Sequence, residues 1–129
     1  MAQDKKYPNV AIKVILLWEG KILMFKHKNG VFDLPGGTME WGESIMETLR
    51  RELKEELDFE LEAEPELFSV YNYISPGRDK HKILIQYIQK LDEQPRLTSL
   101  ENVDFFWLSK EDARSIFADE KLLDKIFVY

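Results

Sequence analysis

The chain has 129 residues, 44% of them hydrophobic and 33% charged, which is enough to bury one hydrophobic core. Its 24 acidic residues outnumber 18 basic ones; the net charge of −6 disfavours duplex nucleic acid as a partner but not a small anionic substrate. The absence of cysteine excludes disulfides and thiolate chemistry and is typical of a reducing cytoplasm, where we expect the protein. No run of eighteen apolar residues or signal-peptide pattern is present, so we expect no membrane span.

We expect one domain over residues 9–129 after a flexible tail at 1–8, because no repeat or Gly/Pro/Ser-rich linker divides the chain. Apolar runs predict strands at 10–18, 21–27, 31–34, 66–74, 82–90 and 103–108, with a loop at 35–44. The sequence predicts helices at 43–57, 109–117 and 120–127, and the second of these begins with Ser109 as its N-cap in a capping-box variant. Because strands and helices intermix, we predict an α/β fold: an α/β/α sandwich whose mixed β-sheet is covered by helices on both faces.

The helix predicted at 43–57 carries glutamates at the edge of its apolar face. The apolar side chains share one stripe, which comprises Ile45, Met46, Leu49, Leu53 and Leu57. Glu52, Glu55 and Glu56 lie beside this stripe at helical spacing, so their like charges repel. Carboxylates suit Mg²⁺ or Mn²⁺, and a divalent cation would turn this repulsion into attraction. The alternative is a solvated acidic face with ion pairs such as Glu47–Arg51 and Arg51–Glu55.

The segment that precedes the helix favours the first interpretation. The stretch from Gly37 to Phe59 resembles the signature of the Nudix hydrolases, G-x5-E-x7-R-E-U-x-E-E-x-G-U, where U is a bulky aliphatic or aromatic residue. Eight of the nine fixed positions match: Gly37, Glu43, Arg51, Glu52, Leu53, Glu55, Glu56 and Phe59. The Leu-Pro-Gly-Gly before it and a later Trp-Leu-Ser are also similar to the family, so the resemblance extends over residues 9–117.

Asp58 is the one departure from the signature, which usually has glycine there to end the helix in a left-handed conformation. Aspartate tolerates that conformation at a cost of roughly 1 kcal/mol. Its charge at the negative end of the helix is also mildly unfavourable. Because no metal-ligand position is affected, we expect a small loss of stability and an intact site.

The resemblance implies a Nudix-like fold and a Mg²⁺-dependent pyrophosphohydrolase, with Mn²⁺ able to replace Mg²⁺. Metal-activated water would cut a phosphoanhydride bond in a nucleoside diphosphate derivative, either a (d)NTP or a small nucleotide sugar such as ADP-ribose. The alternatives are a non-catalytic nucleotide-sensing module of the same fold and a partner-binding protein with an acidic surface. Nucleotide sensors usually lose signature acids, and this chain keeps them. The oligomeric state stays open, with a homodimer among the options.

Site residues also follow from the resemblance. It implies that Glu52 and Glu56 are metal ligands, that Glu55 is a ligand or a base, and that the Gly36 carbonyl supplies a further ligand. Glu52 and Glu55 are therefore also candidate catalytic residues.

Three further signature residues, Gly37, Glu43 and Arg51, are expected to support the site, with Glu43 and Arg51 forming an ion pair that orients the glutamates. Some family members place the general base in the loop before the last strand, where Glu101 lies, and Asp104 is a weaker alternative.

Substrate-binding residues are weakly marked in the sequence. Aromatic side chains could hold a base and basic side chains could contact phosphates; the candidates are Phe25, Lys26, Phe32, Tyr73 and Arg78. Each has a structural alternative, which is core packing for the aromatic residues and solvation at strand ends and a hairpin tip for the basic ones.

Overall fold

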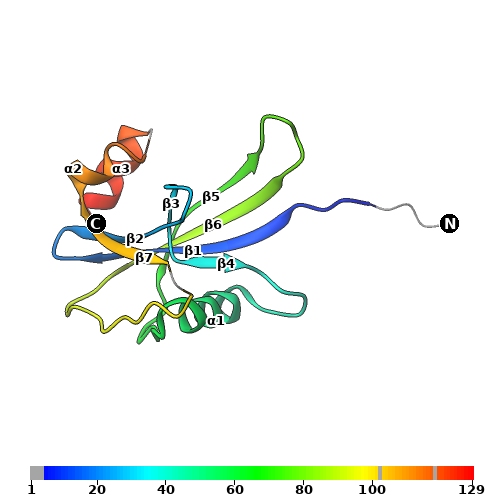
Figure 1. The fold of residues 1–129 in the computed structure, drawn as a ribbon. Coiled ribbons are helices and arrows are strands. Elements are labelled where there is room, and N and C mark those ends of the chain that lie inside the picture. Colours follow the sequence, from blue (N-terminus) through cyan, green and yellow to red (C-terminus); the bar gives the residue numbers. More distant parts are fainter. Residues whose placement is uncertain (1–4, 102, 118) are drawn as a thin grey trace.

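The computed structural model describes residues 5–101, 103–117 and 119–129 (Figure 1). The described residues form these elements in chain order: β1 (Asn9–Trp18), β2 (Lys21–Lys26), β3 (Phe32–Asp33), β4 (Gly36–Thr38), α1 (Ile45–Leu57), β5 (Glu66–Ile74), β6 (His81–Lys90), β7 (Asp104–Ser109), α2 (Lys110–Ala113) and α3 (Glu120–Phe127).

All of these strands belong to one mixed sheet with the order β3-β2-β1-β6-β5, in which β4 pairs with β1 and β7 pairs with β2. The central strands β1 and β6 run parallel, and the other pairs are antiparallel. A two-residue turn joins β1 to β2, and Glu19 and Gly20 both have positive φ there, at 47° and 71°. That combination matches the twist of a tight hairpin.

Residues 36–38, which we predicted as loop, form the short strand β4. Lys13 lies opposite Gly36 and Ile12 lies opposite Gly37 in this pairing. The backbone of the glycine segment is therefore satisfied by β1 instead of by water. This register brings the glycines of the signature against the centre of the sheet.

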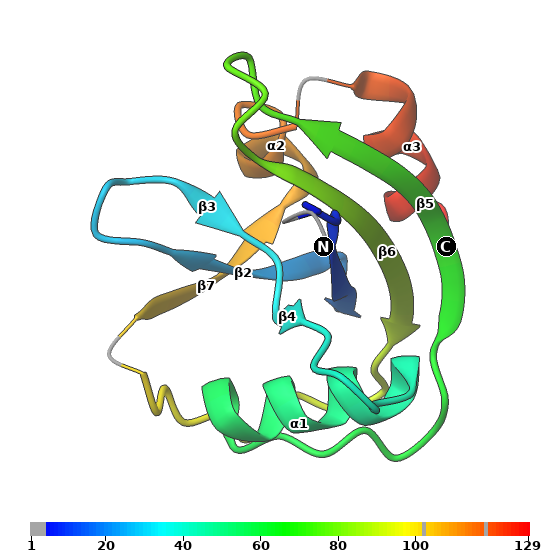
Figure 2. The same cartoon turned by 90° about the vertical axis from the view of Figure 1, so that its right-hand side faces the viewer.

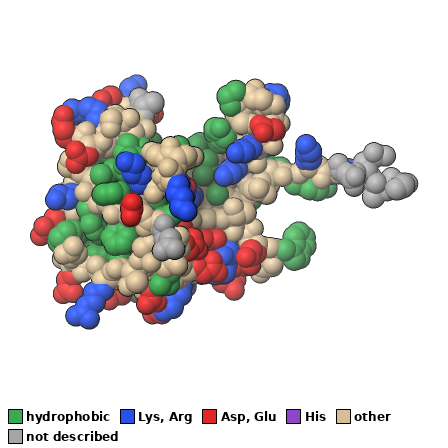
Figure 3. Space-filling model, in the orientation of Figure 1, with side chains coloured by type: hydrophobic (Ala, Val, Ile, Leu, Met, Phe, Trp, Pro, Cys, Tyr) green, Lys and Arg blue, Asp and Glu red, His purple; other side chains and the backbone are tan. Residues whose placement is uncertain are grey.

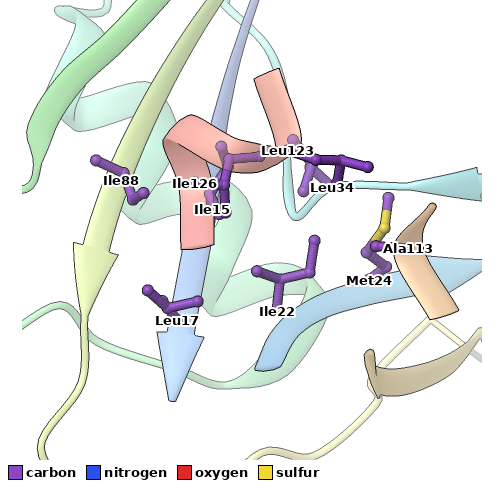
Figure 4. Packing of buried hydrophobic residues seen from close by; sticks show 9 residues of the cluster. All are labelled: Ile15, Leu17, Ile22, Met24, Leu34, Ile88, Ala113, Leu123 and Ile126. Atoms are coloured by element: carbon purple, nitrogen blue, oxygen red, sulfur yellow. The ribbon is translucent and has the colours of Figure 1, made fainter. Parts of the chain in front are cut away.

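Helices cover both faces of the sheet, as predicted (Figures 1 and 2). Helix α1 packs on one face, where Leu49, Leu53 and Leu57 join a buried cluster with side chains of β1 and β2. Helices α2 and α3 pack on the opposite face (Figure 4), over a second cluster that includes Leu123 and Ile126. Because β1 is covered on both sides, its sequence is an almost continuous apolar run.

The ends of α1 have well-defined caps. The helix begins at Ile45, two residues later than predicted, because Ser44 is its N-cap and forms a capping box with Glu47. The Glu47 carboxylate accepts a hydrogen bond from the Ser44 amide at 2.9 Å. The helix ends at Leu57, and Asp58 adopts the predicted left-handed conformation, with φ 52° and ψ 38°.

The C-terminal elements differ from the prediction in one respect. Helix α2 ends at Ala113 instead of continuing to about residue 117, and turns occupy 114–116. Its predicted N-cap, Ser109, is present, and the Ser109 hydroxyl accepts a hydrogen bond from the Asp112 amide at 3.2 Å. Within the described residues, no helix has the length and apolar character needed to cross a membrane.

Candidate active site

Arg51 on α1 lies at the centre of the signature residues. Its Nε donates to Glu43 Oε2 at 2.6 Å, and its Nη1 lies 3.0 Å from Glu52 Oε1 and 3.3 Å from Glu55 Oε2. Its Nη2 donates to the carbonyl of Thr38 at 3.0 Å, which ties the helix to the end of β4. The ion pair predicted between Glu43 and Arg51 is present, and its hydrogen bonds lower the pKa of Glu43 to about 2.

Gly37 lies in close contact with the flexible end of the Glu52 side chain. A Cβ atom at position 37 would overlap the carboxylate group of Glu52, whose side chain is 17% exposed. At Gly36, φ is +128° and a Cβ atom would overlap the carbonyl oxygen of Ile12 in β1. The two glycines therefore let β4 pack between the sheet and the acidic edge of α1.

Glu56 is partly buried. Its Oε1 accepts the Gly36 amide at 2.9 Å. Burial raises the pKa of Glu56 to about 7; the nearby carboxylates of Glu52 and Glu101 also raise it, while the Gly36 hydrogen bond and Lys13 lower it. A carboxylate in this environment would be stabilised by a cation.

Glu101, the candidate general base, lies on a loop that is attached to the C-terminal turn of α1. The amide of Leu100 donates to the Glu56 carbonyl at 3.0 Å, and the amide of Thr98 donates to the Leu57 carbonyl at 3.0 Å. The exposed Glu101 side chain is close enough for its charge to act on Glu56. Asp104, the weaker alternative, begins β7 opposite Lys26.

The oxygen atoms at the edge of α1 are of the type that hard divalent cations bind. They come from Glu52, Glu55, Glu56 and the Gly36 carbonyl, and Figure 3 shows acidic side chains gathered in the region of α1 and β4. Among the described residues, however, no three acidic or histidine side chains converge on a single ion position. Glu52 and Glu55 are turned toward Arg51, and Glu56 is turned toward the Gly36 amide. The donor atoms fit a divalent cation, provided that the carboxylates of Glu52 and Glu55 rotate away from Arg51.

A cavity of about 390 Å³ adjoins β4 and is lined by residues of β1, β3, β4, β5 and β6 and of the β2–β3 connection. Phe32 and Tyr73, both predicted to contact substrate, line it together with Tyr71 and Lys82. Gly37 and Thr38 of β4 also line the cavity, whereas Glu52, Glu55 and Glu56 are not among the described residues that line it.

The other substrate candidates lie elsewhere. The expectation for Phe25 is wrong in this structure, because its side chain is 2% exposed and packs in the core beneath α1. Lys26 is exposed and its Nζ lies 5.6 Å from the centre of the Phe32 ring. Arg78 lies at the β5–β6 turn and lines a separate groove of about 560 Å³.

Lys13 is a site residue that the sequence predictions missed. Its side chain is 12% exposed, and its Nζ lies 3.0 Å from Asp33 Oδ2 and 3.2 Å from the Leu34 carbonyl. The signal available in the sequence was a lone charge inside the apolar run of β1, which calls for a buried polar partner.

The comparison with protein families agrees with this geometry. A model described as the NUDIX domain matches residues 7–127, so the chain belongs to the NUDIX domain family, as the signature predicted. An ADP-ribose pyrophosphatase of Methanocaldococcus jannaschii is 39% identical over 90 residues, which are 67% of this chain and 52% of that protein. An ADP-ribose pyrophosphatase of Bacillus subtilis is 27% identical over 96% of this chain and 70% of its own length. The match thus spans about half of the archaeal relative.

Solved structures show the same fold. The MutT NUDIX hydrolase of Burkholderia pseudomallei superimposes with a TM-score of 0.79 at 23% identity, over 94% of this chain and 99% of that one. A Caenorhabditis elegans Ap4A hydrolase gives a TM-score of 0.71 at 21% identity, over 91% of this chain and 93% of that one. At these identities the likeness establishes the architecture.

Proposed function

We propose that this protein is a divalent-cation-dependent pyrophosphohydrolase that cleaves a phosphoanhydride bond in a nucleoside diphosphate derivative, and that ADP-ribose is its substrate. The observation that carries the proposal is the edge of α1, where Glu52 and Glu56 contact the glycines of β4 and Glu55 lies beside them on Arg51. The names of the two curated relatives support ADP-ribose over a nucleoside triphosphate. The absence of cysteine supports a cytoplasmic location.

The residues of the chain have distinct roles in this proposal. A pyrophosphate resists attack because its negative oxygens repel a nucleophile; bound Mg²⁺ or Mn²⁺ would neutralise those oxygens and lower the pKa of water. Glu52, Glu56 and the Gly36 carbonyl would hold the cation, with Glu55 as a further ligand or a base. Arg51 holds Glu52 and Glu55 in position until they bind the cation.

Proton removal from the attacking water is assigned to Glu101. Its loop is joined to α1 through backbone hydrogen bonds at Thr98 and Leu100, which keep the carboxylate near Glu56. An exposed carboxylate that is not held by an ion pair with Arg51 is free to accept a proton, whereas Glu55 is paired to that guanidinium.

The cavity beside β4 would receive a non-phosphate part of the substrate. A volume of about 390 Å³ suits a nucleoside or sugar group, and the aromatic rings of Phe32, Tyr71 and Tyr73 supply apolar surface for it. Lys82 lies on the same wall and would contact an anionic group.

The test is a substrate panel. Initial rates would be measured with ADP-ribose, ATP, dGTP and diadenosine tetraphosphate, each with Mg²⁺, with Mn²⁺ and with EDTA. The proposal predicts AMP and ribose 5-phosphate from ADP-ribose only when a cation is present, and ¹⁸O-labelled water would identify the phosphorus attacked. Hydrolysis of a triphosphate in preference to ADP-ribose would contradict the substrate. Tight binding in calorimetry without product would favour a nucleotide sensor.

A further inference from the structure

Lys13 has an unusual environment for a lysine. It is the only charged residue of β1, and its neighbours in the strand, Ile12 and Val14, are fully buried. The register places it opposite Gly36, so its side chain reaches the glycine segment of the signature. A lysine is rarely so buried unless its ammonium group is paired, which indicates that this charge is matched to its surroundings.

The Lys13 ammonium has three oxygen neighbours. Besides Asp33 Oδ2 at 3.0 Å and the Leu34 carbonyl at 3.2 Å, it lies 3.4 Å from the carbonyl oxygen of Gly36. The Gly36 oxygen is the backbone atom assigned above to the divalent cation. The positive charge of Lys13 also acts on Glu56, which is on the same edge of the site.

We propose that Lys13 is a positioning residue whose ammonium group contacts the Gly36 carbonyl oxygen when no cation is bound. As a result, the divalent cation binds well only together with an anionic substrate. This proposal rests on the proposed function, because it assigns the Gly36 carbonyl to the cation. It concerns the dependence of cation binding on substrate binding, and it holds for any nucleotide substrate that carries a diphosphate.

The physical reason is charge. A divalent cation bound to the Gly36 carbonyl would share that oxygen with the ammonium group of Lys13, and two neighbouring positive groups would repel in a partly buried site. A diphosphate lying across the edge of α1 carries negative oxygens that attract both. Lys13 and Gly37 line the same cavity, so the ammonium group can turn from Gly36 toward an anion bound there.

Binding of Mn²⁺, followed by electron paramagnetic resonance in the absence of nucleotide, tests the proposal directly. Lys13→Met removes the ammonium group and keeps an unbranched side chain that ends one atom earlier. We expect it to bind Mn²⁺ on the order of tenfold more tightly than the wild type. Lys13→Arg, which keeps the charge, should bind like the wild type. Lys21→Met, at an exposed position on β2, changes the net charge equally and should leave the affinity unchanged.

The second arm adds α,β-methylene-ADP-ribose, which cannot be hydrolysed. We expect this compound to tighten Mn²⁺ binding much more in the wild type than in Lys13→Met, because coupling between two ligands is reciprocal and Lys13 would transmit it. If Lys13→Met does not fold cooperatively, Lys13→Gln, whose amide can still donate to Asp33, replaces it.

The outcomes separate the two proposals. Equal Mn²⁺ affinities in the wild type and Lys13→Met, or a weaker affinity in the variant, would overturn the role of Lys13 and leave the cation site standing. Absence of Mn²⁺ binding in every protein, with and without nucleotide, would overturn the cation site and the Lys13 proposal with it.

Discussion

Single residues in the site are constrained by their neighbours. Arg51 contacts Glu43, Glu52, Glu55 and the backbone of β4, so one guanidinium group fixes both the start of α1 and its acidic edge. Gly36 is fixed by the Ile12 carbonyl and by its positive φ, whereas a side chain at Gly37 would displace the flexible Glu52 carboxylate. These contacts give Arg51 and Gly36 structural roles in the candidate site.

The pairing of Glu43 with Arg51 predicts a specific pH dependence. The pKa of Glu43 is lowered from 4.5 to about 2, mainly by hydrogen bonding to Arg51. The contribution of the Glu43 carboxylate to stability is therefore complete above pH 4.5 and is lost as the pH falls toward 2. Urea unfolding should show Glu43→Gln less stable than the wild type at pH 6. The gap between the two proteins should narrow from pH 4.5 to pH 2. A gap that stays constant over this range would contradict the assigned pairing.

Asp58 predicts that a more stable variant exists. Asp58→Gly relieves the left-handed conformation and removes a negative charge from the C-terminus of α1, so we expect a gain of about 0.5–1 kcal/mol in the free energy of unfolding. It loses only the exposed ion pair with Lys54, which contributes little. Asp58→Ala loses the same ion pair but keeps the strained backbone, and should be about 1 kcal/mol less stable than the glycine variant. Equal stability of the two variants would refute the backbone explanation.

At the level of elements, the buried face and the end of α1 were predictable, and β4 was not. The apolar stripe of α1 and the helix end at Asp58 leave a clear pattern in the sequence, whereas the Ser44 cap that sets the start of the helix was missed. A strand of three residues containing two glycines has no side-chain periodicity, and its place is set by backbone pairing with β1 and by the close approach of Gly36 to Ile12.

The same reasoning applies to individual side chains of the site. The residue type of Phe25 alone does not distinguish a core position from a substrate contact. Its burial depends on which face of β2 lies beneath α1. Lys13 could be singled out as a lone charge in an apolar run, but its partner Asp33 is 20 positions away and is found only in the fold.

The capping box of α1 can be tested by removing its hydroxyl group. Ser44→Ala leaves the Glu47 amide without its acceptor, which is 3.1 Å away in the wild type, and should lower stability by about 1 kcal/mol. Arg50→Ala, at an exposed position of the same helix, is the matched control and should change stability by less than about 0.5 kcal/mol. Chemical denaturation measures both. A loss in the control as large as that in Ser44→Ala would show general sensitivity of the helix instead of a cap.

In the whole molecule, the residues that stabilise the fold and the residues of the candidate site occupy different places. The two hydrophobic clusters hold α1 on one face of the sheet and α2 and α3 on the other. The acidic edge of α1 meets the glycine segment and the loop of Glu101 where the sheet borders α1, and the cavity adjoins Gly37 and Thr38 of β4. The match to the NUDIX domain model covers residues 7–127, so it includes every strand of the described sheet.

We propose that the acidic edge of α1 performs phosphoanhydride hydrolysis. The most direct measurement is the rate of ADP-ribose hydrolysis with saturating Mg²⁺ for the wild type, for Glu56→Gln and for Glu60→Gln, an exposed control just beyond the helix. We predict that Glu56→Gln, folded by its thermal melt, loses roughly 100-fold or more in kcat, because the carboxylate beside Gly36 no longer holds the cation. Glu60→Gln should keep the wild-type rate. A Glu56→Gln enzyme within threefold of the wild type would contradict the account.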